Sequence, residues 1–223
     1  NYNYQKGMKE IIQELKNFLK PKDIGTDSDR ALLLDFQATL EIKPEKAIKL
    51  EKDALAQIEN ITADNARLVS NLHANLGGLY RMNGHPDLAR EHMEKSISLL
   101  DQFNLLHIND SIPQIANYAM FLTEQQEPER GISELQKLSG IIKEYHSDDC
   151  LDYAKVQETL GTIYLMTANL PQAKTHFKRA FKIYEKIWAD EPEMIEAKYQ
   201  EIQELYPQIG FCIGKNLSGL LTK

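Results

Sequence analysis

The sequence has few cysteines and no long apolar run. Its two cysteines, Cys150 and Cys212, are too few for a disulfide framework and lie in no CxxC pair, so we expect a reducing compartment. No apolar run approaches the roughly 20 residues that span a bilayer, and the opening residues Asn-Tyr-Asn-Tyr are not a signal peptide. The sequence therefore predicts a cytoplasmic protein without a membrane partner.

Positive charge is also in deficit. The chain has 26 Lys+Arg against 33 Asp+Glu, a net charge of -7, and no basic block, so the counterion release that drives nucleic-acid binding is not expected. What is present, 42% hydrophobic and 26% charged residues, is typical of a soluble folded chain with one domain or one solenoid. The chain starts at Asn1 without a methionine, and we expect it to be a fragment of a longer protein.

A repeat with a 42-residue period organises the sequence. The stretch LGGLY at 76–80 returns as LGTIY at 160–164, an offset of 84 residues or twice 42, and YAMFL at 118–122 stands midway. Prolines follow the same step at Pro44, Pro86 and Pro128, with Pro171 one residue out of phase. A fixed period of this length indicates stacked units, because one unit cannot bury its own apolar face while stacked copies bury it continuously.

Each unit is expected to be a helical hairpin. The prolines stand where a second helix would begin, and proline is favoured in a first helical turn because its missing N–H has no intrahelical partner there. Apolar and small residues at helical spacing mark one face of each helix. We expect second helices over Asp87–Phe103 and Leu170–Trp188. Close helix contacts are expected at the small residues Gly77, Ala119 and Gly161, beside Tyr80, Leu122 and Tyr164.

The order Leu-Gly-x-x-Tyr followed by Ala-x-x-x-Phe-x-x-Ala resembles the tetratricopeptide repeat (TPR). It is carried best by Leu160, Gly161, Tyr164, Ala173, Phe177 and Ala180. The usual period is about 34 residues, and a 42-residue version with longer helices is similar to the repeats of kinesin light chains and of many bacterial regulatory proteins. The family's tryptophan is absent, its slots being His73, Ile115 and Gln157. HEAT and armadillo repeats, with periods near this one, are the alternative.

The resemblance implies an all-α fold, a right-handed α-solenoid of stacked antiparallel helix pairs forming a TPR-like superhelix. We expect a single solenoid over residues 1–223. Its expected parts are an N-terminal capping helix at 1–21, a degenerate repeat at 28–64, repeats at 66–106, 112–148 and 154–190, and a partial repeat or C-terminal cap at 193–223. The capping helix rests on an amphipathic pattern from Met8 to Leu19 that stops at Pro21.

Motifs that could carry catalysis or bind a cofactor are weak. GFCIGKN at 210–216 has three residues between its glycines where a phosphate loop needs four, and Asn216 where Ser or Thr is required. HSDDC at 146–150 groups possible metal ligands, but it falls in a joint between hairpins, where Ser and Asp normally cap helices. The six histidines are scattered without an HxxxH spacing, and the repeat phase of Tyr80 and Tyr164 indicates core residues. We therefore expect no enzyme, no cofactor and no metal site.

A binding groove follows from the resemblance, because in this family the first helix of each hairpin lines a concave surface. One slot on that surface carries Leu33, Asn75, Asn117 and Thr159. An amide both donates and accepts, so Asn75 and Asn117 can pair with an extended peptide backbone. Alternatively, these two amides bond to neighbouring helices. The predicted peptide-binding residues are Asn71, Asn75, Arg81, Asn117, Met120, Glu124, Lys155, Glu158, Thr159 and Thr162.

Two functions remain open at this point. The first is a non-enzymatic module that binds a protein or peptide in its groove, as a sensory or scaffolding part of a larger protein. This inference is by analogy with the architecture. The second is a structural or self-association role, a homodimer through the terminal helices, in which the N-terminal helix and the apolar tail IGFCIGKNLSGLL at 209–221 pack against another copy.

Overall fold

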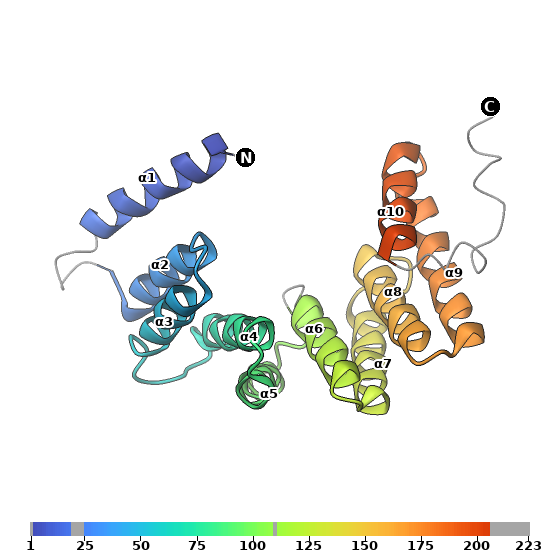
Figure 1. Cartoon of the computed structure of the whole chain (residues 1–223), viewed down its shortest axis with the longest axis horizontal. Helices are drawn as coiled ribbons and strands as arrows, with labels where there is room; N and C mark the ends of the chain where they lie inside the picture. Colours follow the sequence, from blue (N-terminus) through green and yellow to red (C-terminus); the bar gives the residue numbers. More distant parts are fainter. Residues whose placement is uncertain (1, 19–24, 109–110, 206–223) are drawn as a thin grey trace. The chain divides into compact units, whose positions relative to one another are not determined.

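The computed structural model describes residues 2–18, 25–108 and 111–205, and these ranges contain ten helices and no strand (Figure 1). The helices are α1 (Tyr2–Phe18), α2 (Asp27–Thr39), α3 (Pro44–Leu55), α4 (Ala66–Met82), α5 (Pro86–Gln102), α6 (Ser111–Glu124), α7 (Pro128–Tyr145), α8 (Leu151–Met166), α9 (Leu170–Ile187) and α10 (Pro192–Leu205). None of the helices within these ranges is both long and apolar enough to cross a membrane. The fold is the predicted all-α solenoid of helix pairs.

The chain divides into two compact units, residues 1–105 and residues 106–223. Unit 1 contains α1 and the hairpins α2/α3 and α4/α5, with α3 and α2 packed against α4. Unit 2 contains the hairpins α6/α7 and α8/α9, followed by α10, which packs on α9. In each unit, therefore, every hairpin covers the apolar face of the next.

Proline begins the second helix of each hairpin, as predicted. Pro44, Pro86 and Pro128 are the first residues of α3, α5 and α7, and Pro171 is the second residue of α9. The two second helices predicted from the sequence agree with α5 and α9 to within one residue at each end. The prolines therefore give the correct start of each second helix, because the first turn of a helix does not need the N–H that proline lacks.

The turn inside three of the hairpins contains a residue with a left-handed backbone. Gly84, Gln126 and Ala168 have φ values of 72°, 64° and 58°, each two residues before the second helix begins. This conformation ends the first helix, and glycine is its usual occupant because a Cβ atom is disfavoured there by about 1–2 kcal/mol. Gln126 and Ala168 are therefore strained positions that the sequence does not reveal.

The hairpins close on small residues, which confirms the predicted close contacts. A Cβ atom added at Gly77 would lie 2.6 Å from Met93 Cγ, and one at Gly161 would lie 2.9 Å from the Phe177 ring. In α6/α7 the glycine is on the second helix, where a Cβ atom at Gly131 would lie 2.6 Å from the Ala119 carbonyl oxygen. The helices of the α6/α7 hairpin are thus as close as those of α4/α5 and α8/α9, but the glycine is on the second helix instead of the first.

The N-terminal helix α1 runs from Tyr2 to Phe18. Ile12 is buried, whereas Ile11 and Leu15 are 52% and 38% exposed, so α1 covers α2 with only part of its apolar face. Leu19 and Pro21, on which the predicted end of this helix rests, lie outside the described residues. The same holds for residues 206–223, which include the predicted apolar tail and the GFCIGKN motif.

Candidate functional site

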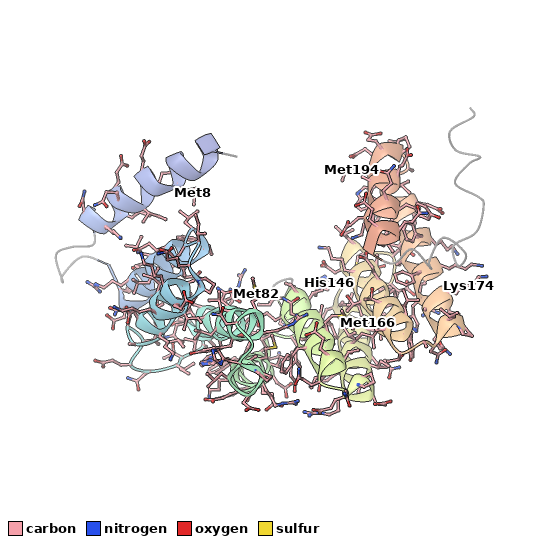
Figure 2. The ribbon with its side chains drawn as sticks, viewed as in Figure 1. Met8, Met82, His146, Met166, Lys174 and Met194 are labelled. Atoms are coloured by element: carbon pink, nitrogen blue, oxygen red, sulfur yellow. The ribbon has the colours of Figure 1, made fainter. Side chains whose placement is uncertain are left out.

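A pocket of about 310 Å³ opens in unit 2 between α8, α9 and α10. Its volume is at the lower end of the range of about 300–1,000 Å³ that ligand pockets occupy. Met194, labelled in Figure 2, comes from the first turn of α10. The lining residues are Leu151 and Lys155 of α8, Tyr184 of α9, Trp188 at its end, and Met194, Ala197, Lys198 and Glu201 of α10. The pocket therefore combines an apolar wall with three charged side chains.

A hydrogen-bonded network supports one side of the pocket. The Tyr184 hydroxyl donates to Glu158 Oε2 over 2.6 Å, and Lys198 Nζ lies 2.9 Å from Glu158 Oε1. Lys198 Nζ also lies 3.1 Å from Glu201 Oε2. Burial raises the pKa of Tyr184, and the charge and hydrogen bond of Glu158 raise it further. Tyr184 is therefore a neutral donor at physiological pH, and it fixes the Glu158 carboxylate in place.

The charge on Lys198 is stable in the same network. Burial alone would lower the pKa of Lys198, but the hydrogen bonds and charges of Glu158 and Glu201 outweigh burial and raise it. The ammonium group therefore stays protonated and holds α10 to α8. Because α10 contributes four of the lining residues, this contact joins the α10 side of the pocket to α8.

Aromatic rings form the α9 wall. The rings of Tyr184 and Trp188 stack with centroids 4.9 Å apart and an interplanar angle of 11°. Trp188 is half-buried and is the single tryptophan of the chain. A flat, rigid aromatic surface with an open face suits the burial of an apolar group from a partner.

The predicted groove residues of α8 share one face with the pocket. Lys155, Glu158, Thr159 and Thr162 follow Leu151 at the spacing of neighbours on a helix surface. Lys155 lines the pocket, and Glu158 belongs to its supporting network. The Thr159 hydroxyl donates to the Lys155 carbonyl oxygen. The pocket thus lies at the N-terminal end of the predicted α8 stripe.

Three further predicted residues lie on α6, which packs directly against α8. Asn117 and Glu124 are exposed, and Met120 is half-buried. Asn117 and Thr159 occupy the same slot of successive repeats. Unit 2 therefore brings seven of the ten predicted groove residues together on two neighbouring first helices.

The remaining predicted residues, Asn71, Asn75 and Arg81, lie half-buried on α4 of unit 1. The Asn75 side-chain amide donates to Asp35 Oδ1 over 2.9 Å and to Glu51 Oε1 over 3.2 Å. Both hydrogens of this amide are therefore used between helices, which is the alternative considered for Asn75. Asn117, by contrast, is exposed.

Half of the residues that line the pocket could not be found by comparing repeats. Met194, Ala197, Lys198 and Glu201 belong to α10, which has no complete partner hairpin within the described residues. One signal was present: Tyr184 occupies the slot of Leu100, 84 residues earlier, where it places a hydroxyl among apolar side chains.

The HSDDC segment caps helices, as expected for its position. Cys150, rather than Ser or Asp, is the N-cap of α8, and its sulfur accepts from the Tyr153 backbone N–H. His146 ends α7, and its Nε2 lies 2.9 Å from the His107 carbonyl oxygen. Across the part of the chain that the structure describes, no three His, Cys, Asp or Glu side chains come together as metal ligands.

Stacked helical hairpins with an open pocket beside a first-helix stripe define an α-helical repeat protein, a class whose members generally act as scaffolds for protein interactions. Residues 111–186 match the sequence model of the tetratricopeptide repeat. The match places the repeats from α6 to α9 in this family, as their motifs indicated.

Solved structures give the same fold. BtubC (BKLC) from P. vanneervenii matches with a TM-score of 0.71 and 18% identity, covering 92% of this chain and 83% of that one. A putative kinesin light chain from Podosopora anserina with nearly identical TPR-like repeats matches with a TM-score of 0.65 and 14% identity, covering 83% and 92%. No curated protein matches the sequence significantly. At these identities the likeness establishes the fold of the repeats.

Proposed function

We propose that this chain is a non-enzymatic module that binds an extended segment of a protein or peptide, as a sensory or scaffolding part of a larger protein. One apolar side chain of that segment enters the pocket of unit 2. The observation that carries the proposal is the position of the pocket at the end of the α8 stripe, where Lys155 belongs to both. Burying one large apolar side chain there contributes about 1.5–3 kcal/mol.

Polar groups on the neighbouring helices α6 and α8 suit the backbone of such a segment. The amide of Asn117 can both donate and accept, and the Thr159 hydroxyl stands in the matching slot of the next repeat. Lys155 is exposed, with its Nζ 3.9 Å from Asp152 Oδ1, and it favours a carbonyl or carboxylate next to the buried side chain. Met120, Glu124 and Thr162 flank these residues in the proposed groove of unit 2. Asn71 and Arg81 of α4 remain proposed peptide-binding residues of unit 1.

Filling the pocket tests the proposal. Peptides selected by display on the wild-type chain should bind Ala197→Phe at least about tenfold more weakly, a loss of about 1.4 kcal/mol, because the new ring occupies the space of the peptide side chain. Binding is measured by the fluorescence of Trp188, which reports on the pocket directly because it is the only tryptophan. Gln203→Phe, an equal change at an exposed position of α10 outside the pocket, should bind like the wild type.

Equal binding by Ala197→Phe, with no change in Trp188 fluorescence, would show that the segment does not use the pocket. If selection returns no peptide and the protein doubles its mass with concentration in sedimentation, self-association becomes the better function. The exposed Ile11 and Leu15 of α1 offer an apolar surface for that contact.

A further inference from the structure

Three polar side chains from three helices meet inside unit 1. They are Asp35 of α2, Glu51 of α3 and Asn75 of α4, and the amide nitrogen of Asn75 joins the two carboxyl groups. The same helices bury Ala31, Ala54 and Leu72 completely. The polar group therefore sits in the interface by which the α2/α3 hairpin is held to α4.

This cluster lacks a donor when both acids are ionised. Asn75 has two amide hydrogens, and one goes to Asp35 while the other goes to Glu51 Oε1. Glu51 is only 2% exposed, and its Oε2 has no hydrogen-bond partner among the described residues. An ionised carboxylate only accepts, whereas a protonated one can donate to its neighbour. A proton on Glu51 therefore supplies the donor that is missing between the two acids.

The electrostatics of the cluster favour that proton. Burial, then the charge and the hydrogen bond of Asp35, raise the pKa of Glu51, and the hydrogen bond from Asn75 lowers it; the net value is about 8. Burial also raises the pKa of Asp35, against the hydrogen bonds from Glu51 and Asn75. Ionising both carboxyl groups in one poorly solvated site costs free energy, because two like charges then lie close together away from water.

The charged side chains of the surrounding helices are directed to other partners. Lys52, next to Glu51 on α3, places its Nζ 5.7 Å from the centroid of the Tyr80 ring. On α4, His73 bonds to His92 of α5, and on α2, Arg30 lies by Asp27 in the first turn. On α1, which packs on α2, the side chains of Glu10, Glu14 and Lys16 are exposed. The groups that act on the Glu51 carboxyl are thus Asp35 and Asn75.

We propose that Asp35 and Glu51 share one proton, and that its release to water in mildly alkaline solution loosens the α2/α3 hairpin from α4. The folded state holds this proton more tightly than the unfolded chain, in which a glutamate has its ordinary pKa of 4.5. The stabilising contribution is therefore complete below pH 4.5, is lost as the pH rises toward 8, and is absent above it. Unit 1 carries a pH-sensitive joint.

Amide hydrogen exchange of the full chain tests the joint. After correction for intrinsic rates, peptides from α2, α3 and α4 should exchange about tenfold faster at pH 9 than at pH 6.5, while peptides from α8 and α9 should not change. In Glu51→Gln the side-chain amide donates to Asp35 without titrating, so the difference should vanish. Asp53→Asn removes an exposed acid of the same helix and should keep the wild-type response.

A direct titration keeps the proposal testable if Glu51→Gln folds poorly. Carbon-13 NMR of the glutamate carboxyl groups should show one resonance titrating near pH 8 in the wild type. In Asp35→Asn that midpoint should fall, because the new amide stabilises an ionised Glu51. Equal pH dependence of exchange in the wild type and Glu51→Gln would overturn the proposal, as would the absence of any glutamate that titrates above pH 6.

Discussion

The hairpins α4/α5 and α8/α9 occupy the same repeat slots, 84 residues apart, and hold their helices together with different chemistry. In both, a tyrosine of the first helix stacks on a histidine of the second: Tyr80 on His92 with ring centroids 5.4 Å apart, and Tyr164 on His176 with centroids 5.3 Å apart. Tyr80 is buried as predicted, whereas Tyr164 is only half-buried. The ring pair is thus the shared element of the two hairpins.

The partner of each histidine differs. His92 Nδ1 lies 2.8 Å from His73 Nδ1, and His176 Nδ1 lies 2.9 Å from Gln157 Oε1. His73 and Gln157 stand where the family has its tryptophan. A hydrogen-bonded pair across the hairpin can therefore replace one indole. In the histidine pair the accepting ring must be neutral, whereas the glutamine oxygen accepts whether or not its histidine partner is charged.

The side chains packed around the glycine also differ between the two hairpins. In α4/α5, Gly77 faces the flexible Met93, and the Ser70 hydroxyl bonds to Ser96 over 3.1 Å. In α8/α9, the matching residues are Phe177 opposite Gly161, and Ala154 and Ala180 in place of the serines. One repeat frame thus tolerates a polar and flexible interior or an apolar and rigid one, provided that the total volume is kept.

The largest expected difference between the hairpins is their response to a methyl group at the glycine. Gly161→Ala should lower the free energy of unfolding by about 1–3 kcal/mol, because the Phe177 ring at 2.9 Å is wedged in a packed core and cannot move aside. Gly77→Ala should lower it by less than about 1 kcal/mol, since Met93 has more rotatable bonds than a phenylalanine ring and alanine favours the helix, although Met93 Cγ at 2.6 Å must still shift. Urea denaturation followed by circular dichroism measures both.

Equal losses in the two variants would mean that the backbone atoms near Gly77, the closest at 3.3 Å, dominate over the side chain. Combining Gly161→Ala with Phe177→Met, which gives α8/α9 the α4/α5 pair, serves as the matched control. Its glycine change should cost less than in the wild-type background.

The next effect concerns acid. Burial lowers the pKa of His73 to about 4, with smaller contributions from the charges of His92 and Lys95. His73 is therefore neutral in the folded state while the unfolded chain takes up a proton below its ordinary pKa of 6.5, so stability is constant above pH 6.5 and falls toward pH 4. His73→Gln, which reproduces the Gln157–His176 pair, should reduce the loss between pH 7 and 5.5 by at most about 1 kcal/mol, because water reaches part of the ring.

Thermal melts of both proteins at the two pH values measure this difference. His85→Gln removes an exposed histidine from the same hairpin and should keep the acid response of the wild type. A His73→Gln chain as acid-sensitive as the wild type would place the sensitivity in His92, whose pKa burial also lowers.

The smallest expected effect lies in the turns, where α4/α5 has Gly84 and α8/α9 has Ala168, both left-handed. Ala168→Gly should stabilise the chain by about 0.5 kcal/mol, the relief of a strained Cβ less the entropy of a new glycine. Gly84→Ala should destabilise it by a similar amount. Guanidinium titration of both variants checks the opposite signs, and a loss in Ala168→Gly would show that the Ala168 methyl group makes a contact worth more than the strain.

The period, the hairpins and their close contacts could be predicted because each requires a particular residue type that recurs at a fixed spacing in the sequence. Proline at the start of a second helix answers a requirement of one turn, and Gly77 and Gly161 record a contact that recurs every two units. Gln126 and Ala168 show the limit of this reasoning. The surrounding hairpin imposes their left-handed backbone, and neither glutamine nor alanine is a residue type from which that conformation would be predicted.

The sequence by itself determined the all-α repeat architecture of this protein, because the order of small and apolar residues sets which helix faces are buried in each repeat. Tertiary structure alone decided which residues meet. It assigned Asn75 to Asp35 and Glu51, and it formed a pocket from α8, α9 and α10. Contacts between residues 24 to 40 positions apart, or with a helix that has no repeated partner, leave no periodic trace for a single sequence to show.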